Sequence, residues 1–165
     1  MSRWRDQVGD DFFPALRLII PEKDRDRVMY GLKEASVAKL IIKLLNLSKD
    51  SDDGYNLMNW KLPARGPPSA NSGDFPGRCY EVLSKRPMRQ KVGNMTIGEV
   101  NEMLDKLASA QKEDIQLPIF REFYQRMNPT ELVWLIRMIL RQMKIGASEK
   151  TFLNVSRCRM FLWLY

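Results

Sequence analysis

Apolar side chains recur with the period of an α-helix along most of this chain, and they do not alternate as they do in β-strands. Between residues 33 and 47 they occupy positions i, i+3, i+4, i+7 and i+8, namely Val37, Leu40, Ile41, Leu44 and Leu45. This spacing places all five on one helical face. Because no alternating β-branched run reaches the length of a strand, the sequence predicts an all-α fold.

Further helices are predicted on both sides of this first one, which we expect to end in turn residues 48–54. They are expected at 12–20, 24–30 and 55–61, from Asp74 as an N-cap, and from about Pro118 onward. Residues 62–74 are rich in Pro, Gly and Ser and are expected to form a loop within one domain, since too little chain lies on either side for two cores. The sequence therefore predicts a single globular domain of roughly seven to nine helices.

Two short motifs mark helix N-termini. Thr96-Ile-Gly-Glu99 has the spacing of a capping box, in which each end residue accepts a hydrogen bond from the backbone N–H of the other. Asn128-Pro-Thr-Glu131 repeats this pattern, with proline at the first helical position. We expect the helix after it to run to Ile145 and to stop at Gly146, because glycine favours the left-handed backbone just past a helix end.

Composition excludes several kinds of active site. The chain has no histidine, so histidine general bases and His-ligated zinc are absent. Its two cysteines, Cys79 and Cys158, are too few and too far apart for a thiolate metal site, and we expect no metal. No secretory signal and no apolar run of 18 residues is present, since Lys43 and Arg137 interrupt the longest stretches. We therefore expect no membrane partner.

Positive charge is concentrated in the later part of the chain. The net charge is +7, and the first 60 residues hold ten basic and ten acidic side chains, so residues 61–165 carry the whole excess, 17 against ten. Such asymmetry indicates a polyanionic partner, most often nucleic acid. The alternative is a basic surface that serves solubility and has no target.

The predicted helix at 129–145 has one apolar face and one cationic face. Trp134, Arg137, Arg141 and Lys144 lie opposite the apolar residues, at i, i+3, i+7 and i+10. Ten residues of helix rise about 15 Å, so these cations match the spacing of successive phosphates on duplex DNA. The alternative is an ordinary solvated helix face, which has the same pattern.

Two long segments resemble a known family. They are LVWLIRMILRQMKIGAS (132–148) and FFPALRLIIPEKDRDRVMYGLKEASVAKLIIKLLNL (12–47). Together they resemble the N-terminal DNA-binding domain of ATP-dependent eukaryotic DNA ligases, and most closely the end-joining ligases, over about residues 4–155. The resemblance implies a helical domain that holds duplex DNA independently of its sequence, in the nucleus, for non-homologous end joining and DNA recombination. It also implies that separate domains of the full-length ligase use ATP and Mg²⁺, so that this chain has no cofactor of its own.

The resemblance also implies roles for particular residues. Lys144 and Gly146 belong to the turn that faces DNA, with Arg141 and Ser148 beside it. Arg137 is a further DNA-binding candidate, and its alternative is an ion pair with an acidic neighbour. Phe12, Phe13 and Pro14 match a surface segment of the family that could bind a repair-protein partner. The alternative interpretation is that these residues form an aromatic plug in the core.

Some features depart from the family. The K-x-D-G motif, whose lysine attacks ATP, is absent, and Lys49-Asp-Ser-Asp-Asp-Gly54 has the wrong spacing, so we expect the chain to be inactive alone. The family's first helix is missing before Trp4, and residues 156–165 form an apolar tail unlike the family. We expect a truncated fragment whose residues 1–155 form the domain. The alternative function is a helical protein-interaction domain that recruits repair partners without direct DNA binding.

Overall fold

The computed structural model describes residues 4, 6, 9–27, 29–67, 69, 71–86 and 91–146, so the predicted tail at 156–165 lies outside the described residues. Within these ranges the chain forms seven α-helices, one short 3-10 helix and no strand, which confirms the predicted all-α fold. The elements are α2 (Phe13–Ile19), η1 (Pro21–Lys23), α3 (Glu34–Leu44), α4 (Asp52–Met58), α5 (Phe75–Ser84), α6 (Ile97–Ser109), α7 (Glu113–Arg126) and α8 (Pro129–Ile139). None of the helices in these ranges is long and apolar enough to cross a bilayer.

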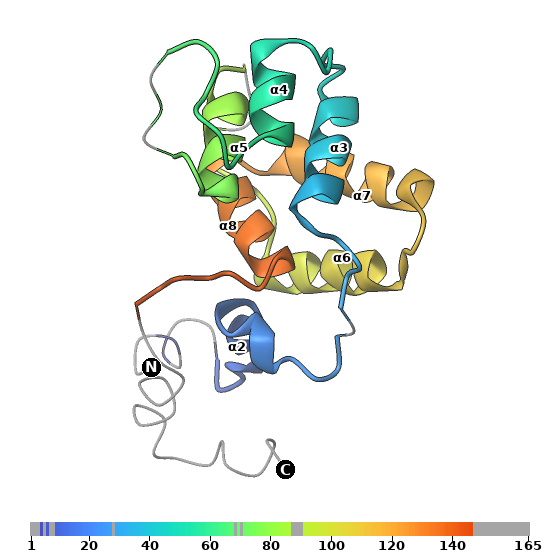
Figure 1. Ribbon diagram of the computed structural model, residues 1–165. Coiled ribbons are helices and arrows are strands. Elements are labelled where there is room, and N and C mark those ends of the chain that lie inside the picture. The colour runs from blue at the N-terminus through green and yellow to red at the C-terminus, as the bar shows by residue number, and fades with distance from the viewer. Residues whose placement is uncertain are drawn as a thin grey trace.

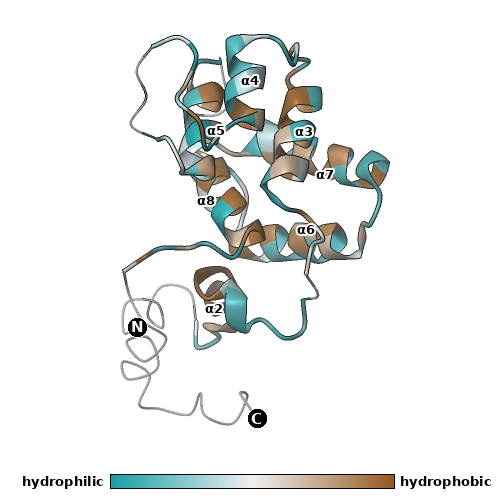
Figure 2. Ribbon diagram, in the orientation of Figure 1, coloured by the Kyte–Doolittle hydropathy of each residue, from teal (hydrophilic) through white to brown (hydrophobic). Residues whose placement is uncertain are grey.

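The helices pack around one core. In Figure 1, α5 lies beside α8 and α3 lies beside α4 and α7, while α6 crosses below this group and α2 lies on the far side of α6. Figure 2 shows that each helix carries both apolar and polar residues, as amphipathic helices do. Among the residues predicted for the face of α3, Val37, Leu40 and Ile41 are fully buried in the core, together with Leu104 of α6 and Phe123 of α7. Each core helix thus contributes one apolar face.

Both predicted capping boxes are present. Thr96 accepts a hydrogen bond from the Glu99 N–H at 3.2 Å, and Glu99 accepts one from the Thr96 N–H at 2.8 Å. Asn128 and Glu131 make the same exchange at the start of α8. The Thr96 N–H and the Arg126 guanidinium together lower the pKa of Glu99 to about 2. These local signals place the starts of α6 and α8 where the sequence predicted them.

Three of the predictions for the segments before α8 were wrong. Residues 25–27 form bends, and the described residues 24, 29 and 30 are not helical either, because the Asp24 carboxylate accepts the Arg27 N–H in a tight turn. The predicted turn at 48–54 contains the first turn of α4, which Ser51 caps by accepting the Gly54 N–H. Helix α7 begins at Glu113, five residues before Pro118, which is tolerated inside it. Asp74 is the N-cap residue of α5, as predicted, but its side chain makes no capping bond, because its carboxylate accepts a hydrogen bond from another helix.

A buried polar cluster joins α2 and the segment after it to α6. Arg27 is 4% exposed and donates from Nε to Asp105 Oδ1 at 2.8 Å and from Nη2 to Asn101 Oδ1 at 2.9 Å. Asn101 in turn donates to the Pro14 carbonyl at 2.9 Å. Burying a guanidinium is costly unless its donors are satisfied. The N-terminal segment therefore depends on this cluster as well as on apolar contact, and nothing in the local sequence marked Arg27 as buried.

Side chains of the flanking helices hold the described residues of the predicted loop, which are 62–67, 69 and 71–74. Asn56 of α4 donates to the Arg65 carbonyl at 3.0 Å and accepts the Arg65 N–H at 2.8 Å. Arg78 of α5, 1% exposed, donates to the Leu62 carbonyl and to Ser72, each at 3.0 Å. The described part of this loop is therefore tied to α4 and α5, and its last residues lead directly into α5.

Candidate nucleic-acid interface

The helix that carries the predicted cationic face ends earlier than predicted. Helix α8 ends at Ile139, and Arg141 has a left-handed backbone with φ 54°. The Gln142 N–H donates to the Arg137 carbonyl at 2.8 Å, and the Arg141 N–H donates to the Met138 carbonyl at 3.1 Å. This pair of bonds is a Schellman motif, which closes a helix without glycine here. The prediction that the helix extends to Ile145 was wrong, so the four residues do not lie on one helical stripe.

Arg137 and Arg141 are both engaged within the protein. Arg137 donates to Asp74 at 2.9 Å, which confirms the alternative interpretation that it pairs with an acidic neighbour. Arg141 donates to the Arg27 carbonyl at 3.0 Å, so its side chain faces the segment that follows η1. Whether either residue also contacts DNA stays a prediction.

Lys144 and Gly146 lie on an exposed turn after α8. Lys144 is exposed, has φ 44°, and makes no hydrogen bond or ion pair with the described part of the chain. Gly146 is exposed with φ 68°, the left-handed backbone predicted for it. Ser148 lies outside the described residues. A free ammonium group beside an exposed glycine backbone is the arrangement expected of a phosphate contact.

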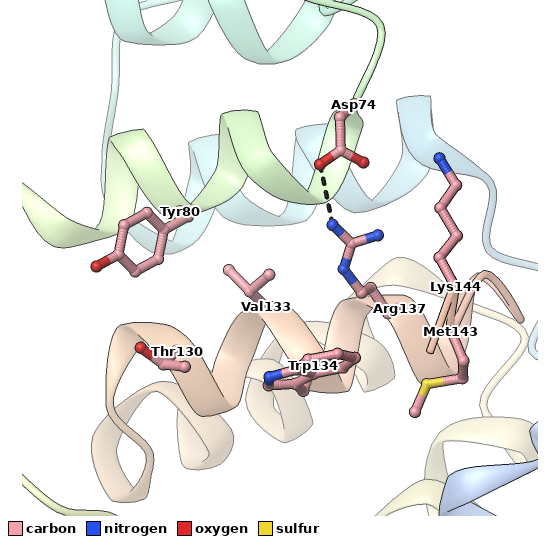
Figure 3. Close-up of a pocket in the computed structure, with 8 residues that line it drawn as sticks. All are labelled: Asp74, Tyr80, Thr130, Val133, Trp134, Arg137, Met143 and Lys144. Carbon is pink, nitrogen blue, oxygen red and sulfur yellow. Dashed lines mark hydrogen bonds and ion pairs between the residues drawn. The ribbon is translucent and has the colours of Figure 1, made fainter. Parts of the chain in front are cut away.

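An open hollow adjoins this turn between α5 and α8 (Figure 3). It has a volume of about 350 Å³ and is lined by Asp74 and Tyr80 on the α5 side, by Thr130, Val133, Trp134 and Arg137 of α8, and by Met143 and Lys144 of the turn. Trp134 is 41% exposed and Tyr80 is 44% exposed. The Arg137 guanidinium lies 5.9 Å from the Trp134 ring centroid. The sequence placed Trp134 on the polar side of its helix, but it did not indicate that Tyr80 would line the same hollow.

The segment predicted as a partner site lies at the surface. Phe13 is 45% exposed at the start of α2, and Pro14 is half-buried beside it. Phe12 packs edge-on against Trp4, with ring centroids 5.1 Å apart. Because none of the three belongs to the core cluster, the alternative of an aromatic core plug was wrong. Their role in binding a partner stays a prediction.

Cys79 is unsuited to nucleophilic chemistry. It is fully buried in α5, and burial raises the pKa of its thiol well above the ordinary value. Lys49 belongs to the segment 49–54, which has the wrong spacing for the K-x-D-G motif, and it is exposed in the turn before α4.

A family model described as DNA ligase N terminus matches residues 2–156 of the chain. The chain belongs to this DNA ligase N-terminal family. The DNA ligase 4 of Coccidioides immitis and that of Aspergillus fumigatus are 62% and 61% identical to it over 155 residues. The DNA ligase 4 of Yarrowia lipolytica is 49% identical over 150 residues. These matches cover 94%, 94% and 90% of the chain, but only 16%, 16% and 15% of the relatives, so the chain spans about a sixth of their length.

In this ligase N-terminal domain, Gly146→Val is expected to destabilise the fold by about 1 kcal/mol, because a β-branched residue is strained at positive φ. A Cβ at Gly146 would meet no described atom within 4 Å, so the cost comes from backbone strain and not from a clash. Urea denaturation measures the change in the free energy of unfolding.

The matched variants are Gly146→Asn and Gly98→Ala. Asparagine tolerates the left-handed backbone and should cost less than valine, and Gly98 lies in the first turn of α6, where alanine should not destabilise. Equal stability of the wild type and Gly146→Val would show that the turn does not need its positive φ.

Proposed function

We propose that this chain is the DNA-binding module of an ATP-dependent DNA ligase, which grips duplex DNA at a nick or break. The single observation that carries the proposal is Lys144, an exposed cation without a partner in the described part of the chain, on a turn that also exposes the Gly146 backbone. Membership of the DNA ligase N-terminal family and the similarity to proteins named DNA ligase 4 support it. By the same similarity, we propose that it acts in the nucleus in non-homologous end joining and DNA recombination.

The proposed contacts are to the DNA backbone. A lysine and exposed backbone N–H groups neutralise or hydrogen-bond phosphates, which carry no sequence information. The affinity should therefore be nearly the same for different duplex sequences. We propose that ATP and Mg²⁺ act in other domains of the full-length ligase, since this sequence has no K-x-D-G motif.

Lys144→Ala is expected to weaken duplex binding by a similar factor for every sequence. If the wild-type protein makes about three to five phosphate contacts, the log–log slope of the binding constant against salt should be roughly −3 to −4.5, and this variant should reduce its magnitude by about one. Fluorescence anisotropy with a labelled nicked duplex at a series of salt concentrations measures both quantities. The free energy of unfolding should not change, since the side chain is exposed.

Lys112→Ala is the matched control, because Lys112 is an exposed lysine that precedes α7. It should leave the affinity and the slope closer to wild type than Lys144→Ala does. Wild-type affinity and slope for Lys144→Ala would remove this turn from the DNA site. Strong preference of the wild type for one sequence over shuffled duplexes would contradict backbone recognition.

Exposure of Phe13 favours a second candidate, a surface of α2 that recruits a repair-protein partner. A site of this kind buries apolar area, and its affinity should barely respond to salt, in contrast to phosphate contacts. Capture of a partner that is lost in Phe13→Asp while duplex affinity is retained would support this candidate. Equal capture by both proteins would exclude Phe13 from it.

A further inference from the structure

We infer that the hollow between α5 and α8 binds one unpaired nucleotide of a DNA strand end. The inference rests on the proposed DNA-binding function and assigns a second ligand group to the same surface. Figure 3 shows Tyr80 on α5, Trp134 on α8 and Lys144 on the turn after α8, with Trp134 between the other two in this view. Two helices and the turn after α8 thus bring aromatic rings and a cation together.

The aromatic rings supply a stacking surface. Trp134 and Tyr80 leave 41% and 44% of their surface exposed, although large aromatic side chains are usually more deeply buried. Val133 and the buried Met143 add apolar surface to the lining of the hollow. Every nucleobase has a flat π-face that stacks on such rings, so recognition would tolerate any base.

The charges of the hollow favour an anion. Asp74 is neutralised by Arg137, with 2.9 Å between Oδ2 and Nη2, which leaves Lys144 as the uncompensated charge among the residues that line it. Arg137, which also lines the hollow, has a buried Nη1 without an acceptor in the described structure, so its guanidinium keeps one unused donor. A nucleotide supplies both required groups, a flat ring and a phosphate.

Size and position indicate a single nucleotide. A volume of about 350 Å³ is near the lower limit of the roughly 300–1,000 Å³ of small-molecule sites, so it accommodates one base more readily than a helix of a partner protein. Lys144 also lies on the turn proposed to contact the duplex. A strand that leaves the duplex at this turn would therefore reach the hollow with its first unpaired nucleotide.

The test compares three duplexes with the 165-residue protein. One is blunt, one has a short single-stranded overhang, and one has the same overhang built from abasic nucleotides, which keep the phosphates and lack the bases. We expect binding of the base-containing overhang to be about five- to tenfold tighter than that of the abasic overhang. This factor corresponds to about 1–1.4 kcal/mol, the lower end of what one stacked base contributes.

Variants locate the effect. Trp134→Leu with Tyr80→Leu should abolish the preference for bases while retaining blunt-duplex affinity, and Phe13→Leu, an exposed aromatic on α2, should retain the preference. A preference that is absent in the wild type, or that survives in the double variant, overturns the inference and leaves the proposed function standing. If the wild type binds none of the three duplexes, both the inference and the proposed function are wrong. If a short acidic, tryptophan-containing peptide binds in a Trp134-dependent manner and the overhang does not, the hollow is a peptide site and the inference is wrong.

Discussion

Leu135→Ala is expected to lower the free energy of unfolding by about 2–5 kcal/mol, which is a large part of the stability of a domain of this size. Leu135 is 1% exposed and belongs to the core cluster in α8, the helix that packs beside α5. Truncating it removes apolar contacts and leaves a cavity that the surrounding helices fill only partly. Urea denaturation followed by far-UV circular dichroism measures the change. The slope of the free energy of unfolding against urea concentration should be the same as in the wild type.

Thr130→Ala on the same helix is the matched control. Thr130 is exposed near the start of α8, so its removal should change the free energy of unfolding by less than about 0.5 kcal/mol. A loss below about 1 kcal/mol for Leu135→Ala would mean that α8 is not packed into the core as described.

Arg27→Met is expected to cost about 3 kcal/mol of stability. The side chains of Arg27 and Asp24 are 2% and 1% exposed, and breaking such a buried pair leaves an uncompensated charge. Asn101 would also lose its hydrogen bond from the guanidinium. The expected loss is at the lower end of the usual range, because Arg17 still pairs with Asp24 and Asp105. Urea denaturation at pH 7 measures it.

The loss of stability in Arg27→Met should also depend on pH, through the ionisation of Asp105. Partial burial by itself raises the pKa of Asp105, but hydrogen bonds and positive charge from Arg27 and Arg17 outweigh it and hold the pKa below its ordinary value of 3.8. A carboxylate whose pKa is lower in the folded state than in the unfolded state stabilises the fold at pH values above its unfolded-state pKa. This stabilisation is lost as the pH falls through the folded-state pKa. The difference in the free energy of unfolding between the wild type and Arg27→Met should therefore be constant above about pH 4 and become smaller below it.

Lys43→Met is the control for Arg27→Met. Lys43 pairs with Glu113 between exposed side chains, so its loss should scarcely shift the urea midpoint. If the two variants lose equal stability, the cluster around Arg27 does not fasten the N-terminal segment.

Helix starts were predictable where the signal is local. The caps of α6 and α8 each involve residues three positions apart, so the interacting groups are neighbours whatever the rest of the chain does. The start of α7 was not predictable in this way. Pro118 suggested a first helical turn, but the acidic residues Glu113 and Asp114 begin the helix five residues earlier.

The end of α8 shows why the spacing of apolar residues predicted a longer helix than the structure has. Met143 falls on the predicted apolar face and is indeed buried, at 7% exposed, although it lies beyond the last helical residue. The chain reaches the core there through the turn at Arg141, because tertiary packing and the Schellman bonds fix the backbone. A pattern of buried residues therefore continued after the helix had stopped.

Sequence alone determined the fold class, the apolar faces of the helices, the two capping boxes and the family, because all of these depend on residue type and short-range spacing. Tertiary structure decided which cations of the predicted DNA surface remain free. Arg137 meets Asp74 from 63 residues away, and Arg141 meets the Arg27 carbonyl from 114 residues away, whereas Lys144 meets no described partner. Pairing at such separations depends on how the helices pack, and no local pattern encodes it.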